Sequence, residues 1–128
     1  EQIIDEFRIH SFLGRSIRAG KKVPRPEVGQ HSWIRSYDGG WKLQYDGFES
    51  TKEMRDLAAR AVEALGLDFG AVDLGLTQDR RLLVLEVNRC PGLEGGTVSS
   101  YGSAITKWCQ GELERKATRT RAEVHPTV

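Results

Sequence analysis

The chain has 128 residues and carries 19 Lys and Arg against 18 Asp and Glu, a formal net charge of +1. Hydrophobic residues make up 38 % of it, and this length supports one domain with a modest core. The near-neutral charge disfavours a nucleic-acid partner, and no apolar run reaches the roughly 18 residues of a membrane-spanning helix. Because no secretory pattern opens the sequence and it has only two cysteines, we expect a cytoplasmic protein with reduced thiols.

Two β-hairpins are predicted in the first third of the chain. Residues 7–13 and 16–19 are β-favouring runs on either side of a Gly-containing turn, which indicates the first hairpin. Residues 20–32 contain two glycines and two prolines and are predicted to form a loop. A second hairpin is predicted from residues 33–35 and 41–45, because a double glycine between them supplies the positive φ of a tight turn.

A helix is predicted to begin at Ser50. Ser50 and Glu53 have the spacing of a capping box, in which the hydroxyl and the carboxylate satisfy free amides of the first turn. One apolar stripe then follows at helical spacing and would pack on a sheet: Met54, Leu57, Ala58, Ala61, Val62 and Leu65. Gly66 stands where a left-handed residue would end the helix.

The second half of the chain predicts two strands and a second helix. The strands are expected over 69–76 and 82–88, and a glycine-rich turn leads to a helix from about Thr97 to Leu113. Its buried side is expected to hold Val98, Tyr101, Ile105 and Trp108. The sequence therefore predicts an α+β fold, an antiparallel sheet with two packed helices, in a domain over residues 1–115. Residues 116–128 are predicted to be a disordered basic tail.

Three polar side chains fall on one face of the last two strands. Glu86 and Asn88 share a face because side chains alternate along a strand. A two-residue turn would pair Asp73 with Glu86, and a turn longer by two residues would pair Asp73 with Asn88. Either register leaves all three on one face. The opposite face would carry the apolar residues Val72, Leu74, Leu76, Leu83, Leu85 and Val87.

The polar trio has the composition of a metal site. Carboxylates directly opposed in a sheet lie about 5 Å apart at Cβ and destabilise it unless a cation or a shifted pKa intervenes. Two carboxylates and an amide oxygen are hard ligands that suit Mg²⁺ or Mn²⁺. The alternative is a solvated face on which Glu86 pairs with Arg35 or Arg89.

Several motifs resemble the C-terminal half of an ATP-grasp domain, in particular that of the ribosomal-protein glutamate ligases and their phage and bacterial relatives. Residues 85–95 contain Glu-Val-Asn-x-x-Pro-Gly-Leu-Glu-Gly, which begins at Glu86. The acidic residue Asp73 lies 13 positions before Glu86, at the end of residues 66–73. Upstream, residues 6–8 resemble the Asp/Glu-x-Arg of the family, and residues 34–36 resemble its Phe-Arg-Ser.

The resemblance implies a role for each matched position. Asp73, Glu86 and Asn88 would hold one or two Mg²⁺ or Mn²⁺ ions between the phosphates of ATP. Contacts with the nucleotide are implied for Glu1, Gln2, Ile3, Glu6, Arg8, Arg35 and Ser36, with residues 1–3 at the adenine-binding hinge and Glu6 at the ribose. Catalytic cations would be Lys21, Lys22 and Arg35. The alternative for these basic side chains is a solvated position or a structural ion pair.

The implied activity is ATP-dependent joining of a carboxylate to an amine, such as an amino acid or a peptide, through an acyl-phosphate. ATP and the two substrates would be the partners, and the sequence is also compatible with an oligomer. The N-terminal lobe of such a domain is missing from this sequence, so we expect that residues 1–128 alone cannot complete a turnover. The competing hypothesis is a non-catalytic nucleotide-binding or interaction module that retains the fold.

Overall fold

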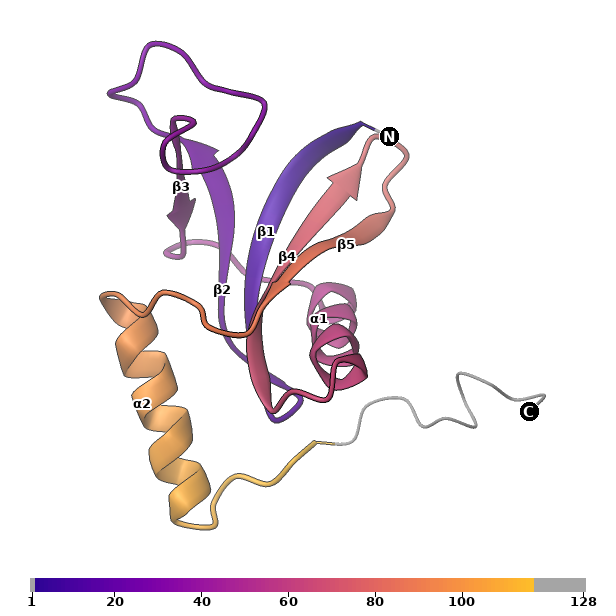
Figure 1. Cartoon of the computed structure of the whole chain (residues 1–128), viewed down its shortest axis with the longest axis vertical. Helices are drawn as coiled ribbons and strands as arrows, with labels where there is room; N and C mark the ends of the chain where they lie inside the picture. Colours follow the sequence, from indigo (N-terminus) through magenta and orange to yellow (C-terminus); the bar gives the residue numbers. More distant parts are fainter. Residues whose placement is uncertain (1, 117–128) are drawn as a thin grey trace, which may run out of the picture.

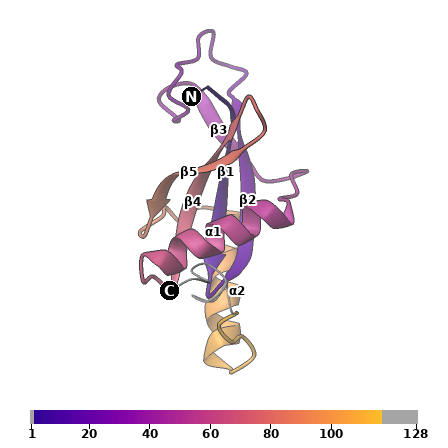
Figure 2. The same ribbon diagram turned by 90° about the vertical axis from the view of Figure 1, so that its right-hand side faces the viewer.

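The computed structural model describes residues 2–116. Five strands form one antiparallel sheet in the order β3-β2-β1-β4-β5, namely β1 (Ile3–Phe12), β2 (Arg15–Pro24), β3 (Trp41–Gln44), β4 (Phe69–Thr77) and β5 (Leu82–Asn88). The two helices, α1 (Lys52–Ala64) and α2 (Gly96–Cys109), lie on opposite faces of the sheet, as Figure 1 and Figure 2 show. The predicted α+β class with an antiparallel sheet and two packed helices is confirmed.

The first predicted hairpin is formed by β1 and β2, but β2 continues to Pro24. The prediction of a loop from residue 20 was therefore wrong over 20–24. Lys21 pairs with Phe7 of β1 on one side and with Gln44 of β3 on the other. These ladder hydrogen bonds on both edges outweigh the weak strand preference of glycine and proline.

The second predicted hairpin does not form. Residues 33–35 are not a strand, because β3 pairs with the extended β2 instead. Residues 25–40 form a loop that is tied together by its own backbone. The Arg25 amide donates to the Gly40 carbonyl at 2.8 Å, and the Ser32 amide donates to the Gly39 carbonyl at 2.8 Å. Trp33 in this loop is 87 % exposed.

Helix α1 packs its apolar stripe on the sheet, as predicted, but its cap differs. Thr51 is the N-cap, and its hydroxyl accepts from the Met54 amide at 3.2 Å. The predicted cap, Ser50, instead accepts from the Arg55 guanidinium. Gly66 has the predicted left-handed conformation, with φ of +70°. Leu65 is 61 % exposed, so its predicted place in the stripe was wrong, because the helix ends before it. The core under α1 consists of Phe7, Ile9, Met54, Ala58, Val62, Val72 and Leu74.

Helix α2 covers the other face with a different side from the predicted one. It ends at Cys109 rather than Leu113, and Gly111 follows it with a φ of +73°. Tyr101 is buried as predicted, but Val98, Ile105 and Trp108 are exposed, and the buried positions are Thr97, Tyr101 and Ala104. The helix lies near the β1–β2 turn, where Tyr101 and Ala104 pack with Phe12 and Leu13.

The register between β4 and β5 is the one that places Asp73 directly opposite Glu86. Nearer the turn the pairing is shifted by one residue, and a bulge after Asp73 compensates for the shift. Leu83 consequently pairs with Gly75, and a Cβ on Gly75 would lie 3.1 Å from Leu85. Both leucines therefore lie on the face of Asp73, and their predicted place on the core face was wrong. The reason is that a bulge reverses the alternation of side chains.

The last described residue contacts the turn of the first hairpin. The Lys116 amide donates to the Leu13 carbonyl at 2.9 Å. Residue 1 and residues 117–128, which include most of the predicted tail, lie outside the described residues. Within residues 2–116, neither helix has the length and apolarity needed to cross a membrane.

Candidate active site

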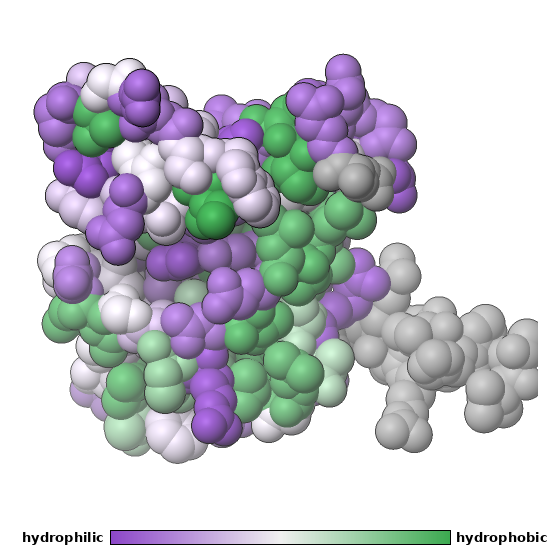
Figure 3. Space-filling view, turned by 45° about the horizontal axis from the view of Figure 1, so that its top comes forward, coloured by the Kyte–Doolittle hydropathy of each residue, from purple (hydrophilic) through white to green (hydrophobic). Residues whose placement is uncertain are grey.

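Charged side chains gather on the part of the α2-side face that α2 leaves uncovered. They come from β1, β2, β4 and β5, and from the loop at residues 25–40. Figure 3, tilted toward the end of the sheet away from α2, shows hydrophilic residues at the floor of a hollow with hydrophobic residues nearby. The alternation of strand side chains brings these groups to one face from residues far apart in the sequence.

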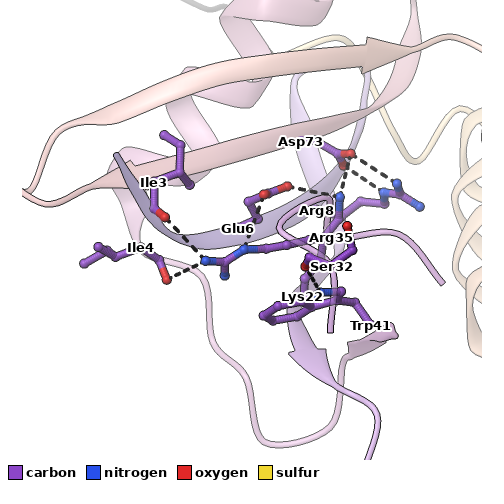
Figure 4. A network of polar contacts seen from close by, with 9 residues as sticks. All are labelled: Ile3, Ile4, Glu6, Arg8, Lys22, Ser32, Arg35, Trp41 and Asp73. Carbon is purple, nitrogen blue, oxygen red and sulfur yellow. Dashed lines mark hydrogen bonds and ion pairs between the residues drawn. The ribbon is translucent and has the colours of Figure 1, made fainter. Parts of the chain in front are cut away.

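Asp73 is the centre of the charged network. It is 6 % exposed, and Arg8 donates to it through Nε at 2.8 Å and Nη2 at 3.2 Å. Lys22 Nζ adds a third contact at 3.2 Å (Figure 4). Burial alone would raise the pKa of Asp73, but the hydrogen bond from Arg8 and the charges of Arg8 and Lys22 outweigh it and lower the pKa. Asp73 is therefore a carboxylate at neutral pH, and it raises the pKa of Arg8 chiefly through the same hydrogen bond.

Glu6 extends the network toward the loop. Its Oε1 lies 3.3 Å from Lys22 Nζ, and its Oε2 lies 3.5 Å from Arg35 Nε. Arg35 also donates through Nη2 to the carbonyls of Ile4 at 3.0 Å and Ile3 at 3.4 Å, as Figure 4 shows. Its guanidinium lies 4.6 Å from the centre of the Trp41 ring. Arg35 thus ties the loop back onto the start of β1.

The structure separates the two adjacent lysines. Lys21 and Lys22 alternate along β2, so they point to opposite faces of the sheet. Lys22 enters the charged network, whereas Lys21 shares the face of Phe7 and lies 3.4 Å from Asp5. The basic pair that the resemblance implied does not converge on one point.

Other residues implied by the resemblance lie at the edge of the network or outside it. Ser36 is exposed, and its hydroxyl accepts from the Gly39 amide at 3.0 Å, which shapes the loop turn. Gln2 is exposed, and its carbonyl accepts from the Gln78 amide at 3.2 Å. Glu1 lies outside the described residues.

The proposed metal ligands Asp73, Glu86 and Asn88, here called the metal trio, retain oxygen lone pairs that are free to bind an ion. Asn88 is two residues from Glu86 on the same face, and its Oδ1 accepts from the Cys90 amide at 2.9 Å. Glu86 is exposed and makes no ion pair with any residue in 2–116. A carboxylate has about four lone-pair positions, and Asp73 uses three of them for Arg8 and Lys22. The trio therefore fits a hard divalent cation in its chemistry.

An ion at this position would need further oxygen ligands. In the part of the chain that the structure describes, no group of three His, Cys, Asp or Glu side chains is placed to hold a metal. The site would depend on the amide oxygen of Asn88 and on oxygens that the protein does not supply. Mg²⁺ commonly completes its octahedron in this way, with water and substrate phosphates.

A buried histidine beneath the network was not predicted as a site residue. His10 is 1 % exposed, its Nδ1 hydrogen-bonds the Tyr101 hydroxyl at 2.8 Å, and its Nε2 lies 3.5 Å from the Tyr45 hydroxyl. Burial, followed by the charges of Arg8 and Arg18, lowers its pKa to about 4. A neutral His10 therefore joins the sheet to α2. The alternation of positions 6, 8 and 10 is the one sequence signal that places it on this face.

Comparison with known proteins identifies the family. The RimK-like ATP-grasp domain matches residues 43–106, which is half of the chain. The chain belongs to this family. The probable alpha-L-glutamate ligase of Citrobacter koseri is 47 % identical over 138 residues, covering 92 % of this chain and 44 % of the relative. The ribosomal protein bS6–L-glutamate ligase of Salmonella paratyphi B is 51 % identical over 71 residues, covering 53 % of this chain and 22 % of the relative. The chain thus spans less than half of either ligase.

Solved structures show the same fold. The D-alanine–D-alanine ligase from Bacillus anthracis superposes with a TM-score of 0.57 at 15 % identity, covering 83 % of this chain and 37 % of that one. The ATP-grasp ligase PsnB, solved with Mg and ADP, has a TM-score of 0.55 at 21 % identity, covering 74 % of this chain and 27 % of that one. At these identities the likeness concerns the fold, and it agrees with the family. The resemblance to an ATP-grasp domain is confirmed.

Proposed function

We propose that the charged face binds Mg²⁺ and ATP for a ligase that joins a carboxylate to an amine through an acyl-phosphate. Membership of an ATP-grasp ligase family supports the reaction class. The observation that carries the proposal is the register that sets Asp73 opposite Glu86, with Arg8 and Lys22 on the same face. Opposed carboxylates next to cations form a site for a metal–phosphate group rather than a stable sheet surface.

Each residue of the network has a role in this proposal. Phosphoryl transfer asks the protein for positioning and for positive charge around the phosphate oxygens. Asp73 fixes Arg8 and Lys22, so that both cations are held in place before a phosphate arrives. Mg²⁺, held by Asp73, Glu86 and Asn88, would supply further positive charge at the phosphate oxygens.

Arg35 links binding of the nucleotide to the loop. In this structure the guanidinium of Arg35 forms an ion pair with Glu6, the residue proposed to accept hydrogen bonds from the ribose hydroxyls. A ribose at Glu6 displaces Arg35, which is then free to reach a phosphate. The loop at residues 25–40 therefore moves or re-forms around the nucleotide when it binds.

The reaction proceeds in two steps. A carboxylate oxygen of the first substrate attacks the γ-phosphorus of ATP, and ADP leaves. The amine of the second substrate attacks the carbonyl carbon of the acyl-phosphate, phosphate leaves and the nitrogen loses a proton. The matched relatives are named glutamate ligases, so L-glutamate is the amino acid to test before others.

Calorimetric titration of the protein with ATP, with and without Mg²⁺, tests the metal site. The wild type is expected to bind ATP at least about tenfold more tightly with Mg²⁺, and Glu86→Gln is expected to lose this gain. Glu63→Gln, which removes an exposed carboxylate on α1, is the matched control and keeps the gain. A wild-type affinity that is the same with and without Mg²⁺ would refute the proposal. In a protein that also contains the N-terminal lobe, Mg²⁺-dependent binding without any ligation would favour the non-catalytic module.

A further inference from the structure

We infer that Arg18, next to the first residue of α2, binds a carboxylate of the amino-acid substrate. The inference deepens the proposed function and rests on it for the identity of the ligand. It concerns a residue that lies outside the metal trio and outside the motifs of the resemblance. Three features of Arg18 support it: its missing counter-charge, its surroundings and its distance from the reacting centre.

Arg18 is a cation without a carboxylate partner. The other cations on its face are paired, Arg8 and Lys22 with Asp73, and Arg35 with Glu6. Among residues 2–116, no carboxylate oxygen lies within 4 Å of the Arg18 guanidinium, and its Nε is buried without a hydrogen-bond partner. An inward-facing guanidinium left without an anion is costly in a folded protein, and a bound anion removes that cost.

The surroundings of Arg18 hold it in one place. Its guanidinium stacks on the Tyr45 ring at 3.7 Å from the ring centre. Gly96 also lies against the guanidinium, since an added Cβ there would be 2.7 Å from Nη1 and 2.8 Å from Nη2. Gly96 is the first residue of α2, so the positive end of the helix dipole lies beside an already positive side chain. Both charges favour an anion here, and a planar guanidinium suits a carboxylate.

The distance from Arg18 to the metal–phosphate site fits a small substrate. Arg8 pairs with Gly20, and Arg18 lies two residues further along the same face of β2. Two residues of a strand correspond to about 7 Å. A dicarboxylic amino acid with one end at Arg18 can therefore present its other end near Arg8 and Asp73. Tyr101 of α2 is buried and hydrogen-bonds His10, the β1 residue that pairs with Arg18, so α2 covers the face next to Arg18.

Three substitutions disturb Arg18 in different ways. Arg18→Gln removes the charge, and Arg18→Lys keeps the charge without the planar fork. Gly96→Ala keeps the arginine but displaces its guanidinium, because the added Cβ would meet Nη1 and Nη2. Gly102→Ala is the matched control in the same helix, since an added Cβ there meets nothing within 4 Å.

The experiment measures binding of L-glutamate by calorimetry, with Mg²⁺ and a non-hydrolysable ATP analogue present, and separately binding of the analogue. Arg18→Gln is expected to weaken L-glutamate binding by about tenfold to a hundredfold, the range for hydrogen bonds to charged groups. Gly96→Ala is expected to weaken it by at least about fivefold, and Arg18→Lys to restore part of the affinity lost in Arg18→Gln. The affinity of Gly102→Ala for L-glutamate should stay within about twofold of wild type. The affinity of every variant for the ATP analogue should also stay within about twofold of wild type.

Three results would overturn the inference. They are no binding of L-glutamate to the wild type, wild-type affinity in both Arg18→Gln and Gly96→Ala, and loss of nucleotide affinity in place of L-glutamate affinity. If Arg18→Gln does not fold, as judged by circular dichroism, Gly96→Ala decides the question alone. Arg18-dependent L-glutamate binding without any Mg²⁺-dependent ATP binding would refute the proposed function and leave this inference standing.

Discussion

Replacing His10 with glutamine should remove a specific part of the pH dependence of stability. The pKa of His10 is about 4 in the folded protein against an ordinary value of 6.5, because the side chain is buried and faces Arg8 and Arg18, with Asp73 acting in the opposite direction. The difference of about 2.5 units, at about 1.36 kcal/mol per unit, corresponds to about 3 kcal/mol of unfolding free energy.

The sign follows from the order of the two pKa values. The folded-state pKa of His10 lies below the unfolded one, so the unfolded chain takes up the proton first as the pH falls. The contribution of His10 to stability is therefore complete above about pH 6.5. It declines as the pH falls toward 4, where protonation of the folded state stops the decline.

The assay is urea unfolding at pH 7 and pH 4.5. Between these pH values the wild type should lose about 2 kcal/mol more unfolding free energy than His10→Gln, since the carboxylates titrate in both proteins. His31→Gln, which replaces an exposed histidine in the loop at residues 25–40, is the control and should lose as much as the wild type. Equal losses in His10→Gln and the wild type would refute the reasoning.

Two further pairs of variants test neighbouring residues with different roles. Lys22→Met should weaken Mg²⁺–ATP binding by about tenfold or more in a calorimetric titration, whereas Lys21→Met, on the opposite face, should change it by less than about twofold. Similar effects of both lysines would contradict the assignment of faces. Thr51→Ala should lower the unfolding free energy in urea by about 1 kcal/mol, because it removes the hydroxyl that caps α1. Ser50→Ala should cost less, and a larger loss there would mean that Ser50 is the cap.

The pairing of Asp73 with Glu86 shows how far local rules reach. The turn arithmetic left two registers open, and the structure has the one that pairs Asp73 with Glu86, although the pairing next to the turn is shifted by one residue and a bulge restores it. Alternation of side chains is a property of each strand, so the shared face of Glu86 and Asn88 followed from the sequence. The bulge depends on how β5 fits against β4, and it turned Leu83 and Leu85 to the face that the sequence had assigned to polar groups.

The loop prediction for residues 20–32 had a larger consequence. Because residues 20–24 were not recognised as strand, the alternation that separates Lys21 from Lys22 could not be applied to them. Strand pairing on both edges of β2 decided the matter, and it is a tertiary property that glycine and proline content does not report. Likewise, the side of α2 that the sequence predicts to be buried is mostly exposed, and only the packing against the sheet shows that Thr97 and Ala104 face inward beside Tyr101.

What the sequence determined by itself was the apolar stripe of α1, the glycine that ends this helix, the two strands of the metal trio and the ATP-grasp motif. The helix and the strands depend on residues within about a dozen positions of one another, where backbone geometry and side-chain periodicity act directly, and the motif is a pattern of residue types that the sequence displays without any contact. The tertiary structure decided the contact of Arg35 with Glu6, that of His10 with Tyr101 and the position of Arg18 against Gly96. These partners lie far apart along the chain, and they meet only because the order of strands in the sheet and the packing of α2 bring their faces together.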